Sequence, residues 1–252
     1  MTYCVGMKLR RGLVFMADTR TNAGIDNVST FRKLYTWETP GERFLTLMAA
    51  GNLATTQEVV SLLEERAKAP DKRDPSILHT ESIFQTARLV AATLKEVVAG
   101  MTGGGQTANS PFAASFILGG QIAGGEPRLF LIYPEGNFIE AGDDTPFFQI
   151  GETKYGKPII VRAYDADMDF PDVIKLLLVS FDSTLKANLS VGMPLDLLIY
   201  DKGDLKAGMR HRFERDDAYF RLVSEGWSKA LKDAFTILPG FPGPGVDEAK
   251  RS

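Results

Sequence analysis

The sequence predicts a layered fold in which helices cover the outer sides of β-sheets. Two observations support this prediction. The expected strands, such as 12–18 and 44–50, carry apolar residues on both faces, which is typical of strands that are covered on both sides. The expected helices come in pairs that follow strands, and their apolar residues recur at helical spacing. A helix with one apolar stripe must bury it against another element, so we expect these pairs to pack onto sheets.

The first strands form a hairpin. Residues 2–9 alternate between two faces, and a second apolar run, 12–18, follows after a short polar turn. One face of the first strand carries Tyr3, Val5 and Met7, and the other carries Thr2, Cys4 and Gly6. The hairpin returns Asp18 to the level of Thr2, and a loop then leads to Lys33 at the start of a third strand.

Further strands and helices follow along the chain. The remaining predicted strands are 44–50, 112–122 and 128–133. The predicted helices are one that starts after Asn52, and then 80–101, 171–187 and 216–236. Asn52 is a typical N-cap residue, and Pro171 suits a first helical turn.

Composition favours one domain without a metal or a cofactor. We expect a single domain over 1–252, in which 206–252 is a C-terminal extension of a helix and a Pro/Gly-rich tail. The two histidines, His79 and His211, lie outside any metal-ligand spacing. A net charge of −3 predicts no basic surface for nucleic acid, and no apolar run of about 18 residues suggests a membrane span. We therefore expect neither nucleic acid nor a membrane as a partner.

The single cysteine bears on the compartment. Cys4 cannot form an internal disulfide, which fits a reducing cytoplasm, and we expect no secretory signal. Free cysteines are often buried, so we interpret Cys4 as a strand residue of the core rather than as a nucleophile. The polar group formed by Asp182, Ser183 and Thr184 is expected to face solvent or another subunit.

The residues near the N-terminus carry the strongest chemical signal. Thr2 follows Met1, so removal of one residue would leave a threonine with a free α-amine. That amine has an ordinary pKa of about 7.7–8.0 and can act as general base for the hydroxyl of the same residue. A nearby lysine would lower the pKa of the amine by like-charge repulsion, and a carboxylate would hold the lysine in place. Asp18 and Lys33 are the candidates for these two roles.

Gly51 is a candidate for binding an oxyanion. It follows the strand 44–50 at the start of a helix, where backbone N–H groups are exposed. A tight turn without a chemical role is the alternative, and the residues alone leave both interpretations open.

Several motifs resemble the proteasome β-subunit family. These are a threonine at position 2, ADTRTNAG (17–24), a lysine entering the third strand, and LMAAGNLATTQ (47–57). Within the family, TYCVGMKL (2–9) and SFDSTLKANLSVGMPLDLLIYD (180–201) are similar to the bacterial Anbu subfamily. The resemblance implies an α+β fold, a four-layer α/β/β/α sandwich of the N-terminal-nucleophile type.

The resemblance also implies a threonine-type endopeptidase without a cofactor. Thr2 would attack an amide carbonyl, Lys33 would tune its amine, and Asp18 would orient the lysine. The amide of Gly51 would bind the oxyanion, or that of Ala50 if the family motif is aligned one residue earlier. The residues that would hold a peptide as an added strand are Thr21 and Asn22. The implied partners are a peptide or unfolded protein substrate and further copies of the chain in a ring or spiral.

Two positions depart from the family pattern. Glu152 stands where the family has a serine that supports the catalytic amine. Ser190 fits a second supporting serine, but the family's aspartate falls on Ala187 or Asn188. These changes predict a low catalytic rate. Two other functions therefore stay open: an N-terminal-nucleophile amidase or acyl transferase acting on a small amide, and a weakly catalytic assembly subunit.

Overall fold

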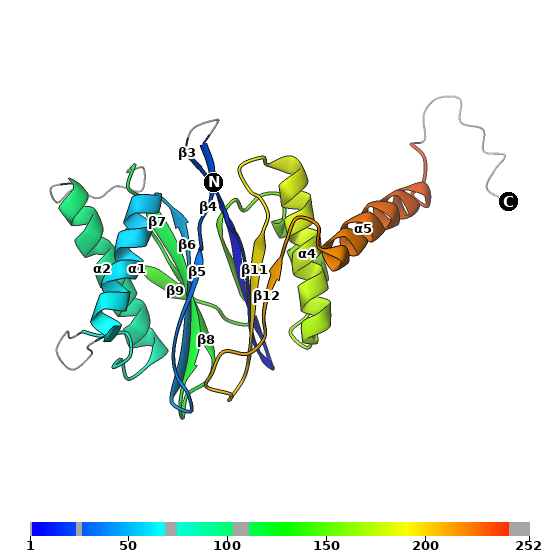
Figure 1. Ribbon diagram of the computed structural model, residues 1–252. Coiled ribbons are helices and arrows are strands. Elements are labelled where there is room, and N and C mark those ends of the chain that lie inside the picture. The colour runs from blue at the N-terminus through cyan, green and yellow to red at the C-terminus, as the bar shows by residue number, and fades with distance from the viewer. Residues whose placement is uncertain (1, 24–26, 69–74, 103–110, 242–252) are drawn as a thin grey trace, which may run out of the picture.

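The computed structural model has four layers, in the order helices, sheet, sheet and helices (Figure 1). It describes residues 2–23, 27–68, 75–102 and 111–241. The predicted α+β fold, a four-layer sandwich, is therefore confirmed. No helix within these ranges is long and apolar enough to cross a membrane.

The sheet that contains the start of the chain, called the N-terminal sheet below, is antiparallel throughout. Its strands are, in spatial order, β10 (Phe147–Gly151), β1 (Tyr3–Leu9), β2 (Gly12–Asp18), β11 (Leu195–Asp201) and β12 (Arg210–Phe213). The hairpin of β1 and β2 pairs Cys4 with Ala17, which brings Asp18 to the start of β1 as predicted. Leu195 of β11 lies opposite Asp18 on the other side of β2.

The second sheet, called the meander sheet below, follows the order of the chain. Its strands are β5 (Leu34–Thr39), β6 (Arg43–Gly51), β7 (Ala114–Ile122), β8 (Arg128–Ile132) and β9 (Phe138–Glu140). Between β2 and β5 the chain forms a separate hairpin of β3 (Arg20–Ala23) and β4 (Asn27–Thr30). The sequence predicts only a loop there, because these short polar segments lack the alternation that marks a half-buried strand.

Helices cover the outer side of each sheet (Figure 1). The meander sheet is covered by α1 (Leu53–Lys68) and α2 (Ile83–Thr102), and the N-terminal sheet by α3 (Lys157–Ala163) and α4 (Phe170–Ala187). The last helix, α5 (Ala218–Thr236), packs against α4 near its start and then extends away from the sandwich. Pro171 lies in the first turn of α4 as predicted, and Asp169 caps that helix by accepting a hydrogen bond from the Asp172 N–H at 2.9 Å.

Three apolar cores separate the four layers, because each strand sends alternate side chains to opposite sides. In β1, Tyr3, Val5 and Met7 pack toward α3 and α4, whereas Cys4 lies between the two sheets. Cys4 is fully buried, so its interpretation as a core residue is confirmed.

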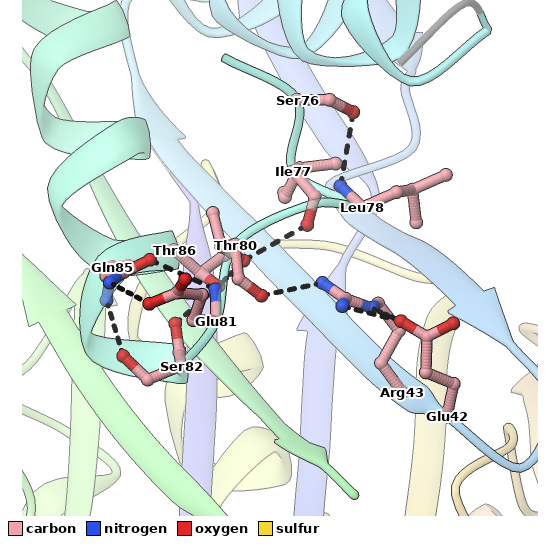
Figure 2. Close-up of polar contacts among 10 residues, drawn as sticks. All are labelled: Glu42, Arg43, Ser76, Ile77, Leu78, Thr80, Glu81, Ser82, Gln85 and Thr86. Carbon is pink, nitrogen blue, oxygen red and sulfur yellow. Dashed lines mark hydrogen bonds and ion pairs between the residues drawn. The ribbon is translucent and has the colours of Figure 1, made fainter. Parts of the chain in front are cut away.

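Arg43 of β6 anchors the segment that leads into α2 (Figure 2). Its guanidinium donates to the Thr80 carbonyl oxygen at 2.9 Å and forms an ion pair with Glu42 at 2.6 Å. Two residues further on, Ser82 caps α2 by accepting a hydrogen bond from the Gln85 N–H at 3.2 Å. These contacts fix the start of α2 against the meander sheet.

A polar contact joins the two sheets at the opposite end of β2 from Asp18. Gln121 of β7 accepts hydrogen bonds from the Tyr200 hydroxyl of β11 at 2.6 Å and from the Gly203 N–H at 2.8 Å. The Tyr200 ring also stacks on Phe44 of β6, with the ring centroids 4.5 Å apart. The sheets are thus tied together where β1 turns into β2.

Helix α3 and strand β12 are likewise absent from the sequence prediction. Helix α3 has seven residues, which is too short to show a clear helical period. Strand β12 lies within 206–252, where we expected a helix and a tail. Its RHRF run is exposed except for Phe213, so it has no apolar face that a pattern could reveal.

The expectation that Asp182 and Thr184 face solvent or another subunit is wrong. Both side chains are buried on α4. Asp182 accepts a hydrogen bond from the Ser224 hydroxyl of α5 at 2.6 Å and pairs with Lys186 at 2.8 Å. Sequence reasoning treats a polar side chain as solvated unless it can name a partner, and here the partner is supplied by α5 of the same chain.

Candidate active site

Thr2 lies at the start of β1 and is 8% exposed. Its carbonyl oxygen accepts a hydrogen bond at 2.6 Å from the N–H of Glu152, the residue directly after β10. Gly151 has a φ of +83°, and a Cβ there would lie 2.0 Å from the Thr2 carbonyl oxygen, so only glycine permits this close approach. The position of Thr2 is therefore set by β10 as well as by β1. Met1 lies outside the described residues.

Asp18 and Lys33 form a buried ion pair at the end of β2. The Lys33 Nζ is 2.7 Å from the Asp18 Oδ1, and the two side chains are 7% and 0% exposed. Asp18 also accepts hydrogen bonds from the Tyr3 N–H at 2.9 Å and the Gly192 N–H at 3.2 Å. The Lys33 ammonium donates in addition to the Arg20 carbonyl oxygen at 2.5 Å. Two fixed acceptors thus set the orientation of the ammonium.

Burial acts on the charge of this pair. It raises the pKa of the Asp18 carboxyl, while the Lys33 ammonium and the two backbone N–H donors oppose that shift. A carboxylate in such a place depends on its cation, because a buried charge left without a partner is costly. The pair therefore behaves as a unit.

Thr2 and Lys33 line one pocket of about 240 Å³, called the nucleophile pocket below. The other lining residues come from β3, from the ends of β5 and β6 and from the start of α1: Thr21, Arg32, Tyr35, Ala49, Ala50, Gly51, Asn52, Leu53 and Thr56. The pocket brings together a hydroxyl, an oriented ammonium and the end of a strand at a helix start. In the part of the chain that the structure describes, no three His, Cys, Asp or Glu side chains are grouped as metal ligands would be.

Two of the remaining predicted residues line this pocket. Gly51 and Thr21 line it, and Asn52 caps α1 by accepting a hydrogen bond from the Thr55 N–H at 3.1 Å. Asn22 lies in β3 next to Thr21, but its side chain is outside the described part of the structure.

Glu152 contacts Asn188, one of the two positions on which the family's aspartate falls. The Glu152 carboxylate accepts hydrogen bonds from the Asn188 side-chain amide at 2.9 Å and from the Lys154 N–H at 2.8 Å. The Asn188 side-chain Oδ1 in turn accepts one from the Ser190 N–H at 2.9 Å. Ser190 is therefore connected to Glu152 only through Asn188, and it does not line the nucleophile pocket.

Sequence reasoning missed Arg20 and Gly192. Gly192 donates to Asp18, and a Cβ on it would lie 2.2 Å from the Arg20 Nε. The Arg20 guanidinium donates to the Leu189 carbonyl oxygen at 2.8 Å, so it fixes the segment before β11 over the ion pair. A glycine just before a strand can signal such a close approach, but the pattern does not reveal its partner.

The four-layer fold, with Thr2, Asp18 and Lys33 grouped at one end, is that of the N-terminal-nucleophile hydrolases. The model of the proteasome subunit family matches residues 2–198. The chain is 27% identical over 207 residues to proteasome subunit beta 2 of Pyrobaculum calidifontis, a match that covers 79% of this chain and 88% of that protein.

Solved structures of bacterial Anbu proteins are more similar. The helical assembly of the Anbu complex from Pseudomonas aeruginosa has a subunit with a TM-score of 0.88 and 50% identity, covering 96% of this chain and 98% of that one. Anbu from Yersinia bercovieri gives a TM-score of 0.89 and 46% identity, covering 96% and 100%. The chain belongs to the proteasome subunit family and, within it, to the Anbu subfamily.

Proposed function

We propose that the chain is a threonine-type endopeptidase with Thr2 as its nucleophile. The observation that carries this proposal is the placement of Thr2 in one pocket with Lys33, whose ammonium is held 2.7 Å from Asp18. Membership of the proteasome subunit family supports it. The proposal requires that the peptide bond before Thr2 be cut, because only a free amine can accept a proton near neutral pH.

In the proposed reaction, the Thr2 hydroxyl oxygen attacks the carbonyl carbon of a peptide bond while the Thr2 amine accepts the hydroxyl proton. The C–N bond then breaks, the leaving amine takes that proton, and the acyl group remains as an ester on Thr2. A water molecule attacks the ester, and the amine relays its proton to the Thr2 oxygen as the acid product leaves. Each cycle consumes one water and needs no cofactor.

Lys33 and Asp18 act on the base rather than on the substrate. The Lys33 charge lowers the pKa of the Thr2 amine, so that more of it is unprotonated and able to accept a proton. Asp18 and the Arg20 carbonyl oxygen hold the Lys33 ammonium in one orientation. Asp18 also fixes the strand by accepting from the Tyr3 N–H, next to Thr2.

The N–H of Gly51 is the proposed oxyanion donor. The Ala49 N–H donates to the Lys33 carbonyl oxygen at 3.0 Å, and the Asn52 N–H donates to the Ala113 carbonyl oxygen at 2.9 Å. Successive N–H groups of a strand point to opposite edges, so that of Gly51 points to the same edge as that of Ala49. At Gly51, this edge of β6 extends past Leu34, the first residue of β5. This direction favours Gly51 over Ala50 as the donor.

The β3 strand is the proposed support for an extended peptide. β3 pairs with β4 along one edge, so a peptide can add to the other edge as a further strand. Thr21 of β3 and Thr2 line the same pocket, which supports the proposal that Thr21 and Asn22 contact the peptide backbone.

Glu152 and Ser190 are proposed as supporting residues. The Glu152 N–H positions the Thr2 carbonyl, and the Glu152 carboxylate is held by Asn188, which also accepts from Ser190. Neither Glu152 nor Asn188 supplies the serine and aspartate of the family pattern, so we expect a low rate of turnover.

Assembly is a second proposed function. The similar Pseudomonas aeruginosa protein forms a helical assembly. In this chain α5 has no buried residue, and its apolar side chains Leu222 and Phe235 are exposed. We propose that 1–252 is one domain whose extension 206–252 joins copies into a ring or spiral, and that it works in the cytoplasm, which the free thiol of Cys4 supports.

The proposed peptidase is tested by mass spectrometry after treatment with a peptide epoxyketone or a β-lactone. Protein that begins at Thr2 should gain one adduct on that residue, and protein in which a residue precedes Thr2 should gain none. Thr2→Ala should gain none, and Thr2→Ser should retain some reaction. An adduct on another residue, or unchanged peptide turnover in Thr2→Ala, would contradict the proposal. Turnover of small amides but not of peptides would favour the amidase alternative.

A further inference from the structure

Arg32 lines two adjoining pockets. One is the nucleophile pocket. The other, called the edge pocket below, has a volume of about 390 Å³ and is lined by residues before and at the start of β5 and on the strands β11 and β12. The two pockets share Arg32, so its side chain stands between the nucleophile and a second hollow along the edges of the two sheets.

The Arg32 guanidinium is held in place by its own neighbours. Its Nε donates to the Leu34 carbonyl oxygen at 2.5 Å, and its centre lies 5.5 Å from the ring centroid of Tyr35. The Tyr35 hydroxyl donates to the Arg32 carbonyl oxygen at 2.7 Å, which fixes the backbone as well. These contacts use the inner nitrogen, and within the described ranges the two terminal nitrogens form no hydrogen bond or ion pair.

The charges around Arg32 are mostly positive. Among the residues that the structure describes, no Asp or Glu lines the nucleophile pocket, and Lys33 there is already paired with Asp18. In the edge pocket, Asp196 is neutralised by Arg212 through two hydrogen bonds of 2.6 and 2.9 Å.

A second arginine extends the positive surface of the edge pocket. Arg210 donates to the Thr36 hydroxyl at 2.8 Å and has no carboxylate partner among the residues that the structure describes. Arg32 and Arg210 therefore lie one after the other along the two pockets that lead away from Thr2. Neither is paired with a carboxylate among the described residues.

We propose that Arg32 selects substrates that carry a carboxylate next to the scissile amide. This inference rests on the proposed peptidase function of the nucleophile pocket. A guanidinium whose two terminal nitrogens are free binds a carboxylate with two parallel hydrogen bonds, which a neutral amide of the same shape cannot reproduce. Arg210 attracts further acidic residues of a longer peptide. The carboxylate can belong to an Asp or Glu side chain or to the end of the peptide chain.

Peptide binding to full-length Thr2→Ala protein tests the inference without requiring catalysis. Three labelled peptides of one sequence are compared by fluorescence anisotropy: one with a central Glu and an amidated end, one with Gln and an amidated end, and one with Gln and a free carboxylate. We expect the Glu peptide to bind roughly tenfold more tightly than its Gln amide counterpart, which is the scale of a charge-assisted contact. The advantage should shrink at high salt.

Arginine variants in the same background locate the effect. Arg32→Gln should make the Glu peptide and its Gln amide counterpart bind with equal affinity, and Arg32→Lys should keep part of the preference for carboxylate. Arg10→Gln, which changes an exposed arginine paired with Asp167, is the matched control and should keep all of it. A preference for the free acid over the Glu peptide would assign the carboxylate to the chain end.

Equal binding of all three peptides, or a preference that survives Arg32→Gln, would overturn the inference. Failure of the proposed peptidase function looks different. In that case no electrophile labels Thr2, whatever the binding preference. The two results are therefore read from separate experiments on the same chain.

Discussion

The surroundings of Thr2 and the helix α5 differ in how their side chains are held. Asp18, next to Thr2, is fully buried and accepts three hydrogen bonds of 2.7 to 3.2 Å. On α5 no side chain is buried, and Leu222 and Phe235 are 67% and 75% exposed. Buried, paired charges fix the geometry that chemistry needs, whereas an exposed apolar face is complete only when another surface covers it. Changes in the first region should therefore alter rates, and changes in the second should alter association.

The largest effect is expected for Lys33→Ala. Loss of the ammonium should lower the rate of Thr2 labelling by roughly a hundredfold or more, the usual scale for a positioned acid–base contribution. It should also lower the free energy of unfolding by about 3–5 kcal/mol, because the Asp18 carboxylate remains buried without its cation. Labelling kinetics and denaturant titration measure the two effects.

Two comparisons sharpen that prediction. The double variant Asp18→Asn/Lys33→Met removes both charges, so it should recover most of the stability but none of the labelling rate. Arg10→Ala breaks an ion pair whose side chains are 75% and 63% exposed, and should cost less than about 1 kcal/mol. If Lys33→Ala were as harmless as Arg10→Ala, the ion pair would not fix the surroundings of Thr2.

The next effect concerns Gly151. In Gly151→Ala the new Cβ would lie 2.0 Å from the Thr2 carbonyl oxygen, so the strand start must shift. We expect the labelling rate to fall roughly tenfold to a hundredfold, because a displacement of about 1 Å can cost that much. Gly124→Ala is the matched control: its φ of +80° imposes similar backbone strain, but nothing lies within 4 Å of the added Cβ. An equal loss of labelling in both variants would show that strain alone is responsible.

A smaller effect on folding is expected from removal of α5. A chain that ends at Asp217 keeps β12 paired with β11 and loses 218–252, which includes a helix without buried residues and the Ser224 hydroxyl that bonds Asp182. Its unfolding midpoint should fall by a few degrees, whereas light scattering should show smaller assemblies than for the full chain. Replacing Leu222 and Phe235 by serine keeps the helix and should have the same effect on assembly. Unchanged assembly in both variants would show that α5 does not contribute to association.

The smallest effect is expected at Cys4. Burial raises the pKa of its thiol, so less thiolate is present at any given pH than in an ordinary cysteine. Iodoacetamide should therefore modify Cys4 slowly at mildly alkaline pH in the folded protein and rapidly after unfolding. Cys4→Ala should leave Thr2 labelling nearly unchanged. Lost labelling in a Cys4→Ala protein that still folds would contradict its place in the core.

Much of the fold follows from patterns in the sequence, for a physical reason. Alternation of apolar side chains in 2–9 and 12–18 determines which faces are buried, and the observed hairpin follows. The segments β3, β4 and β12 are held by backbone hydrogen bonds to neighbouring strands rather than by an apolar face. Residue types carry little information about such pairing, so these strands were not predicted.

The candidate site also has one part that the sequence predicts and one part that it does not. The meeting of Asp18 and Lys33 could be predicted, because the hairpin and the next strand bring both to one end of a sheet. The contact of Glu152 with Asn188 could not, since it joins a turn after β10 to the end of α4 across 36 residues. That contact depends on how α4 lies over the sheet, which packing decides and no local pattern records.

The tie between Gln121 and Tyr200 has a mechanical consequence. It holds the two sheets together at the far end of β2, while the Asp18–Lys33 ion pair joins β2 to the segment before β5 near Thr2. A strand of seven residues is a lever of roughly 20 Å, so a rotation of about 3° would move its other end by about 1 Å. Displacements of that size matter to a nucleophile. We therefore expect the width of the nucleophile pocket to depend on both contacts, the glutamine at one end of the sandwich and the ion pair at the other.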